Sequence, residues 1–257
     1  GLQFGMTFSG VTDPDAIPIS LYAKLENSNL FGEGKSISAS TAISTNEQAL
    51  DFTYSQNWIK NLPITYSQSL AFSHSSSMAQ NNMFLPNLTL NQYNYYMAYE
   101  ALTGSLNTAF ARRWFPDFAI LTATVGLTDS VTRYNYNESL YTPTDLGISI
   151  FANRWGMLNS IWTAVSLDGR DLNYDPSKGW FVSERLAWNG LLPGIEKEFF
   201  LKTDTKLEGY FTLFDIPVTE KWNFKSVFAA YTGLTALFPT PNTVITESNK
   251  LYIDGMF

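Results

Sequence analysis

Cysteine is absent from this sequence of 257 residues, and histidine occurs once, as His74. The lack of cysteine excludes a disulfide-stapled scaffold and every thiolate zinc site. A single imidazole leaves no multi-histidine metal centre, so we expect neither a metal nor another cofactor. Because His74 begins a serine-rich stretch, we expect an exposed histidine there rather than a member of a catalytic triad, and we expect no enzyme.

Charge is also scarce, with 15% of residues charged against about 25% in globular proteins. The net charge is −7 and the nearest approach to a basic cluster is Arg112-Arg113, so nucleic acid is not an expected partner. No apolar run approaches the ~18 to 20 residues of a spanning helix, which excludes a helical membrane protein. An aromatic content of 16% excludes disorder.

The sequence is instead rich in apolar and polar residues that alternate with a period of two, the pattern of a strand with two different faces. The clearest segment is EFFLKTDTKLEGYFTLF. One face carries Lys202, Asp204, Lys206 and Glu208, and the other carries Phe199, Leu201, Leu207, Phe211 and Leu213.

Segments of this kind predict eleven strands, several of them longer than the ~5 to 6 residues usual in globular sheets. They lie at residues 2–10, 17–27, 35–45, 48–58, 63–74, 98–113, 117–130, 159–168, 180–190, 197–214 and 221–236. Short connections rich in turn residues are expected at 28–34, 59–62, 113–117, 168–179 and 215–220. Two connections, at 75–97 and 130–158, are too long for ordinary hairpins.

Successive strands of such a sheet run in opposite directions, so alternate connections lie at the same end. One rim then carries short turns and the other carries long loops, an asymmetry typical of outer-membrane barrels. We therefore predict an all-β fold, a transmembrane antiparallel up-and-down β-barrel. The charges on the strand at 197–214 are predicted to face its lumen, and the apolar residues on the same strand to face lipid.

The seven tryptophans are predicted to form two aromatic girdles at the membrane interfaces. Trp58, Trp114, Trp180 and Trp222 flank short connections, whereas Trp155, Trp162 and Trp188 lie near the opposite strand ends. Glu184 alternates in phase with Trp180 and Trp188, which would place a carboxylate against lipid, so we predict a β-bulge that resets the register there. Core tryptophans beside the turns of a soluble sheet are the alternative.

Two local motifs have plainer interpretations than catalysis. LFGEGKS resembles part of a phosphate-binding loop, but ISASTAIS after it alternates like a strand where such a loop needs a helix. Asp168 and Asp171 could be posed as a general acid and base. Their turn is rich in Asp, Asn, Pro and Gly, which favours local hydrogen bonding instead.

Three stretches together resemble the membrane barrel of the BamA-type outer-membrane assembly proteins, a group that includes the mitochondrial and chloroplast import barrels. NSNLFGEGKSISAS is similar to the family's turn between strands two and three, and YSQNWIKNLPIT to its pattern of an aromatic followed by proline, here Trp58 and Pro63. DGRDLNYDPSKG matches the family's turn before strand nine at Asp168, Arg170, Asp171, Pro176 and Gly179, and departs from it at 172–175. The segment GLQFGMTFSGVTDPDAIP resembles the spirochaete branch.

The resemblance covers nearly all of the chain and implies a sixteen-strand barrel preceded by periplasmic POTRA repeats. Residues 1–257 would then comprise strands one to eleven and the start of the sixth extracellular loop, without the POTRA repeats and the C-terminal strands. The odd strand count agrees, because bacterial single-chain barrels have even numbers. Alternatively, 249–257 is a twelfth strand that completes a small barrel.

The family's role implies assembly and insertion of β-barrel proteins into the bacterial outer membrane. Its first strand templates an incoming client strand at a lateral gate, which here would be formed by Leu2, Gln3, Phe4, Gly5, Met6, Thr7, Phe8, Ser9 and Gly10. Gly5 and Gly10 would lower side-chain packing in that strand, although two glycines can also mark only a bend. The implied partners are outer-membrane lipid, unfolded outer-membrane protein clients, and accessory assembly lipoproteins bound through the absent POTRA repeats.

Two other classes of protein fit parts of the pattern. In a passive diffusion porin, the charges on the strand at 197–214 would line a pore. A soluble β-sandwich adhesin or carbohydrate binder also has alternating strands, but the low charge and the tryptophan positions disfavour it. From the family match and the density of turn residues at 168–179, we expect Arg170 to hold two carboxylate oxygens of a structural turn with its fixed fork.

Overall fold

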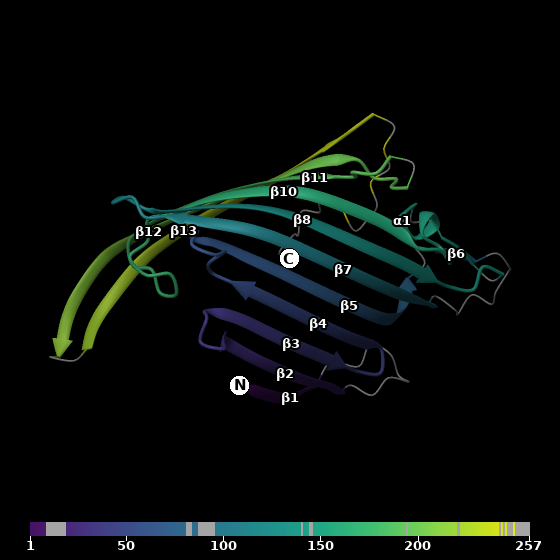
Figure 1. Cartoon of the computed structure of the whole chain (residues 1–257), viewed down its shortest axis with the longest axis horizontal. Coiled ribbons are helices and arrows are strands. Elements are labelled where there is room, and N and C mark those ends of the chain that lie inside the picture. Colours follow the sequence, from purple (N-terminus) through teal and green to yellow (C-terminus); the bar gives the residue numbers. More distant parts are fainter. Residues whose placement is uncertain are drawn as a thin grey trace.

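The computed structural model describes residues 1–8, 19–80, 84–86, 96–139, 141–143, 146–193, 195–219, 222–241, 243, 245 and 249. Eleven strands form one antiparallel sheet in which every strand pairs with its neighbours in chain order (Figure 1). Their bounds are β1 Leu2–Phe8, β2 Ile19–Leu30, β3 Lys35–Ile43, β4 Glu47–Gln56, β5 Ile64–Gln80, β7 Tyr96–Trp114, β8 Ile120–Asn135, β10 Gly156–Asp168, β11 Gly179–Asn189, β12 Phe200–Thr219 and β13 Trp222–Pro239. The predicted all-β up-and-down arrangement of eleven strands is confirmed.

The sheet has an apolar face and a polar face, because directly paired residues of neighbouring strands share a face. One row across six strands, on the apolar face, consists of Leu2, Leu25, Ala39, Phe52, Leu70 and Leu106. The next row, on the polar face, consists of Gln3, Lys24, Ser40, Asp51, Ala71 and Ser105. The alternation read from the sequence thus becomes two chemically distinct surfaces.

The apolar face is largely uncovered, since Leu2, Leu25 and Phe52 are all exposed. Among the described residues, the buried hydrophobic side chains are only Ala109, Ala119, Ile148, Ala187 and Phe200. A sheet in water would need a second layer over such a surface. A continuous exposed apolar face instead fits strands whose outer solvent is lipid.

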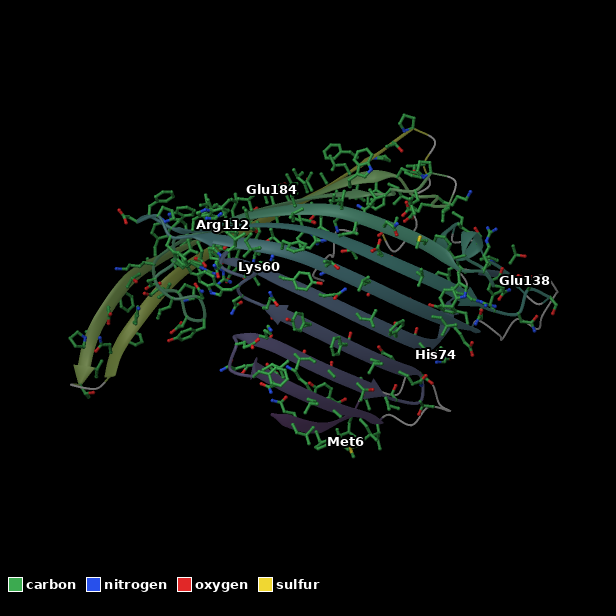
Figure 2. All side chains as sticks on the ribbon, in the orientation of Figure 1. Met6, Lys60, His74, Arg112, Glu138 and Glu184 are labelled. Atoms are coloured by element: carbon green, nitrogen blue, oxygen red, sulfur yellow. The ribbon has the colours of Figure 1, made fainter. Side chains whose placement is uncertain are left out.

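The two rims of the sheet differ as predicted. The connections after β2, β4, β7 and β10 lie at one end with the tip of the β12–β13 hairpin, and those after β5 and β8 lie at the other (Figure 1). We call these ends the turn rim and the loop rim. Lys60 and Arg112 lie at the turn rim, and His74 and Glu138 lie at the loop rim (Figure 2).

Strand ends differ from the sequence prediction where the alternation fails. β5 and β7 stay paired as far as Gln80 and Tyr96, so the expected loop at 75–97 is shorter. The segment HSSSMAQ is polar at successive positions and gives no period-two signal, although its backbone continues the ladder. β3, in contrast, follows the LFGEGKS turn directly, which confirms a strand where a phosphate-binding loop needs a helix.

β12 also runs further than expected, to Thr219, through the connection predicted at 215–220. The pairing of β12 with β13 shifts register between Thr212 and Phe214. The alternation of apolar and polar residues after the shift is therefore out of phase with the alternation before it. A bulge of this kind inserts one residue and breaks a period-two pattern without ending the strand.

The long connections contain structure that the sequence pattern did not predict. β6 Phe84–Pro86 pairs with β9 Tyr141–Pro143 in a second, two-stranded sheet, and α1 covers Leu146–Ile150. These elements are too short to show a hydrophobic period. No helix in the described part of the chain combines the length and the apolar character needed to cross a bilayer.

Candidate functional site

The first strand, β1, forms one edge of the sheet. It pairs with β2 over seven residues, from Leu2 opposite Leu25 to Phe8 opposite Ile19, and in the part of the chain that is described its other edge has no strand beside it. Phe4 and Phe8 on its apolar face are 76% and 75% exposed. Of the predicted gate residues, Leu2 to Phe8 therefore lie in this edge strand, whereas Ser9 and Gly10 lie outside the described residues.

Gly5 is covered by its neighbour on β2. A Cβ atom at Gly5 would lie 3.6 Å from Cδ1 of Tyr22, the residue directly opposite. The aromatic ring lies beside the position of the missing side chain at an ordinary contact distance, an arrangement seen for aromatics next to glycines in edge strands. Gly5 thus lowers the packing that β1 itself contributes, and Tyr22 supplies part of it from the neighbouring strand.

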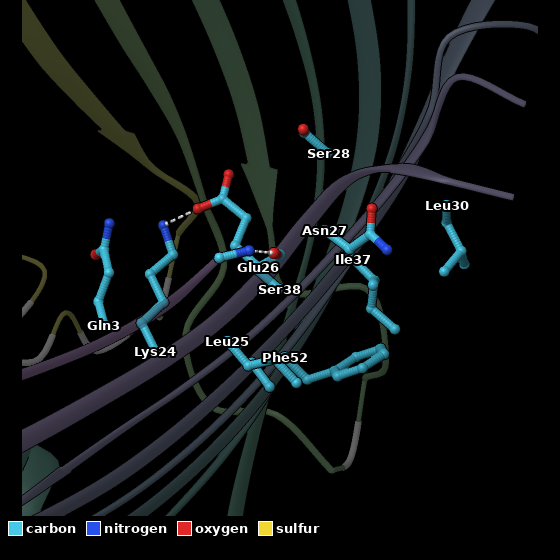
Figure 3. A pocket seen from close by; sticks show the side chains of 12 residues that line it. Gln3, Lys24, Leu25, Glu26, Asn27, Ser28, Leu30, Ile37, Ser38 and Phe52 are labelled. Atoms are coloured by element: carbon cyan, nitrogen blue, oxygen red, sulfur yellow. Dashed lines mark hydrogen bonds and ion pairs between the residues drawn. The ribbon is translucent and has the colours of Figure 1, made fainter. Parts of the chain in front are cut away.

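A hollow of about 760 Å³ lies where this edge meets the turn rim (Figure 3). Gln3, Lys24 and Glu26 line it on the polar face, and Lys24 Nζ lies 2.6 Å from a Glu26 carboxylate oxygen. The register of β2 against β3 shifts between Asn27 and Leu30. The pairing next to the edge strand is therefore irregular at its turn-rim end.

The connection at 169–178 is a clamped turn centred on Arg170. Its guanidinium donates to both oxygens of Asp168, at 2.9 Å from Nε and 2.8 Å from Nη2. The remaining Nη1 donates to Glu208 of β12 at 3.1 Å. Because its Cζ also lies 4.7 Å from the centroid of the Phe181 ring, Arg170 ties the turn to two strands, as the predicted fork requires.

Asp171 holds the rest of the turn together. One carboxylate oxygen accepts the backbone N–H groups of Leu172, Ser177 and Lys178 at 3.0, 2.9 and 3.2 Å, and the other accepts the Ser177 hydroxyl. The Ser177 hydrogen bond, followed by those of the backbone, lowers the pKa of Asp171 well below its ordinary value. Every oxygen of this carboxylate is occupied, so it has a structural role and is not poised as an acid or base.

Acid is expected to loosen this turn. The folded-state pKa of Asp171 is depressed, so its contribution to stability is fully present above the ordinary value of 3.8 and is lost as pH falls through the folded-state pKa. We expect the urea midpoint of the folded barrel in detergent to drop on acidification from about pH 6 to about pH 2. Asp171→Asn, which keeps one acceptor oxygen and cannot titrate, should reduce this slope; an unchanged slope would contradict the assignment.

Gly179 ends the turn in a conformation that other residues rarely adopt, with a φ of 107°. A Cβ atom there would lie 2.2 Å from the carbonyl oxygen of Gly169. Pro176 lies within the same turn, two residues before Lys178, whose carbonyl accepts the N–H of Asp171 at 3.2 Å. The five residues that carry the family resemblance therefore lie at one turn, whose hydrogen bonds are made by Asp168, Arg170 and Asp171.

The predicted lumen charges share the polar face of β12 and are paired with one another. Lys202 Nζ lies 3.8 Å from Asp204, and Lys206 Nζ lies 2.5 Å from Glu208. Glu208 also accepts the Tyr210 hydroxyl at 3.0 Å. Its long-range pairing with Arg170 is a contact that no local spacing in the sequence could indicate.

The tryptophans do not all have the environment that two membrane-interface girdles would give them. Trp58, Trp114, Trp155, Trp180 and Trp188 are exposed, and the side chain of Trp222 lies outside the described residues. Trp162 differs, because it lies on the polar face with Arg185 4.5 Å above its ring and its Nε1 donating to Thr128 at 3.1 Å. It occupies the space above Gly126, which has no side chain. Trp162 therefore points to the polar face, and its predicted place in an aromatic girdle at the membrane interface is wrong.

The β-bulge predicted at Glu184 is also wrong. The pairing of β11 with both neighbours is continuous, and Glu184 lies on the apolar face directly opposite Thr205. The Thr205 hydroxyl donates to its carboxylate. A local hydrogen-bond donor, and not a change of register, accommodates the charge.

The connection between β11 and β12 contains buried carboxylates that were not anticipated. Glu196, 2% exposed, follows β11 and accepts the backbone N–H groups of Asn159 and Leu192. It ties the β11–β12 connection to β10, and the composition of that segment gives no signal for it.

Comparisons with known proteins agree with this geometry. Residues 29–255 match the family model described as the Omp85 superfamily domain. A Treponema pallidum (strain Nichols) protein, provisionally named an outer membrane protein assembly factor, is 33% identical over 248 residues, covering 91% of this chain and 30% of the relative. The crystal structure of BamA from Haemophilus ducreyi lacking POTRA domains 1–3 has a TM-score of 0.60 at 14% identity, covering 100% of this chain and 44% of that one. The chain thus spans less than half the length of either.

Proposed function

The chain belongs to the Omp85 superfamily, and on that basis we propose that it is part of a barrel that assembles and inserts other β-barrel proteins. The resemblance to BamA-type barrels, including their spirochaete members, is confirmed by a spirochaete relative and by the similar fold, and the chain is a component of the bacterial outer membrane. The proposed partners are membrane lipid, unfolded barrel clients, and accessory lipoproteins bound by POTRA repeats elsewhere in the protein. The proposed chemistry is strand pairing without a catalytic side chain.

The free edge of β1 is the observation that supports this proposal. In lipid, every backbone N–H and C=O must be paired, because an unsatisfied group facing hydrocarbon costs several kcal/mol. An edge strand therefore binds any strand that reaches it. We propose that β1 pairs weakly with the last strand of the complete barrel, so that a client strand can displace it and be templated along β1.

Disulfide crosslinking tests this gate. In the complete protein, Gln3→Cys or Met6→Cys would be combined with a cysteine on the final strand and oxidised, since a disulfide needs Cα atoms within ~7 Å. We expect the crosslinks to form and to abolish insertion of outer-membrane proteins into membranes. Reduction of the crosslinks should restore insertion.

The matched control is Gln3→Cys with Lys24→Cys, which joins directly opposed residues of β1 and β2. It fixes the same strand without closing the gate, so insertion should continue. Efficient closure of the gate with insertion undiminished would overturn the proposal. Together with a steady, ion-selective conductance in planar bilayers, that outcome would favour a diffusion porin lined by the polar face.

A further inference from the structure

The hairpin of β12 and β13 extends past the rest of the sheet at the turn rim. The last residue of β11 to pair with β12 is Gly179, opposite Tyr210. Beyond it, residues 211–219 pair only with 222–228, so a two-stranded ribbon continues and curves away from the other strands (Figure 1). We call this segment the ribbon.

One face of the ribbon is apolar and exposed. Its side chains, between 42% and 64% exposed, are Phe211, Phe214, Ile216, Phe224 and Phe228. Phe214 and Phe224 contact each other across the ribbon, with ring centroids 5.5 Å apart. A contiguous exposed apolar surface of this kind marks an interaction site.

The opposite face of the ribbon is mainly polar, with Val227 opposite Thr212 as an apolar member. Asp215 lies opposite Lys225, and the Asn223 side chain donates to Asp215 at 3.0 Å. These charges balance one another within the ribbon, so they offer no net charge to a charged protein partner. The ribbon therefore has the two-sided character of a surface between an apolar solvent and water.

The bulge in β12 keeps the apolar face of the ribbon continuous with that of the sheet. Before the bulge in the sequence, Leu207 and Phe211 lie on the apolar face. After the bulge, Phe214 and Ile216 lie on the same face. If β12 continued through Leu213 in regular alternation, with no bulge, Phe214 and Ile216 would have turned to the polar face. The surface that contacts lipid along the sheet thus extends into the ribbon without a break.

The length of the ribbon limits how it can be placed relative to the membrane. Trp180, at the interface end of β11, is level with Gly209. The nine residues from Phe211 to Thr219 span about 30 Å at ~3.3 Å per residue, as much as the whole hydrocarbon core of a bilayer. The ribbon consequently extends beyond the membrane and cannot be a further transmembrane stretch.

We propose that the ribbon bends onto the membrane at the turn rim and lies with its apolar face against a phospholipid surface. A two-stranded hairpin is marginally stable alone in water and needs cover on its apolar face. Continuity with the lipid-contacting face identifies that cover as lipid. The polar face then points to water, and the ribbon attaches the barrel to the leaflet outside its own wall.

Site-specific fluorescence in the complete protein tests this proposal. Ile216→Cys, on the apolar face, would carry an NBD label, and Asp215→Cys, one residue away on the polar face, is the matched control. Both proteins would be reconstituted into vesicles of phosphatidylethanolamine and phosphatidylglycerol, and folding checked by heat-modifiable mobility. Brominated lipid is expected to quench the label at 216 several-fold more than at 215, and iodide in the aqueous phase to show the reverse order.

Each other outcome contradicts the proposal. Equal quenching by iodide at both positions would show a ribbon free in water. Protection of position 216 from both quenchers would show that protein, and not lipid, covers the apolar face. A label at Phe224→Cys, directly opposite Ile216 on the apolar face, should repeat the result at 216 if lipid is the cover.

Discussion

Gly179→Ala is expected to destabilise the folded barrel by about 3 kcal/mol or more, because the change forces both a strained backbone and a clash with backbone atoms. The φ of 107° is unfavourable for alanine. The new Cβ would lie 2.2 Å from the Gly169 carbonyl oxygen and 2.8 Å from Cα of Arg170. Neither neighbour is a flexible side-chain end, so the clamped turn itself must move. The urea midpoint of heat-modifiable mobility in detergent measures the loss.

Gly209→Ala is the matched control for this prediction. Gly209 lies in the neighbouring strand, opposite Trp180, and a Cβ atom there would be 3.7 Å from the end of the Phe211 ring. That distance is an ordinary contact, so we expect a change within about 1 kcal/mol. Equal losses for the two variants would show that general strand packing, and not the turn geometry, explains the effect.

Arg170→Ala is expected to cost about 2 to 4 kcal/mol, because it removes the partner of two carboxylates that are largely buried. The side chains of Asp168 and Glu208 are 15% and 7% exposed. Glu208 keeps Lys206 and Tyr210 as partners, which limits the loss on that side. The same denaturation measurement applies, with cellular abundance of the folded protein as a second readout.

Two variants separate the fork from the charge. Arg170→Lys keeps the charge but cannot donate to both oxygens of Asp168, so it should recover only part of the loss. Arg112→Ala removes an arginine that lies 5.1 Å from the ring centroid of Trp114 and should cost less than about 1 kcal/mol. If Arg170→Ala left folding and abundance intact while abolishing insertion, Arg170 would have a direct functional role and the structural assignment would be wrong.

Most of the fold could be predicted because a strand with one apolar and one polar face has apolar and polar residues at alternate positions in the sequence. Lys202 to Glu208 show this most clearly, and their strand is found where the alternation places it. The prediction failed where that rule is broken by local chemistry. Because the bulge at Thr212 to Phe214 interrupts the alternation, the last segment of β12 at the turn rim was not predicted as strand. Because the residues after His74 are polar at successive positions, the loop-rim ends of β5 and β7 were not predicted either.

The candidate site could be predicted less completely, because its contacts join residues distant in sequence. Alternation and turn residues predict strand one and the turn at 168–179, but their roles follow only from the resemblance to a family. Glu208 as the partner of Arg170, and Tyr22 as the cover of Gly5, depend on which strand lies opposite which. Trp162 likewise points to the polar face because Gly126 on the next strand leaves room for it, and no pattern within its own strand contains that information.

The chain-order pairing of the sheet has a consequence for how the protein reaches its native state. Neighbouring strands in the sheet are consecutive among the eleven in chain order, so each step of folding closes only the loop between two consecutive segments. Loop-closure entropy grows slowly with loop length, and local contacts form fast. The sheet can therefore grow hairpin by hairpin as a zipper, with each completed strand serving as the nucleus for the next.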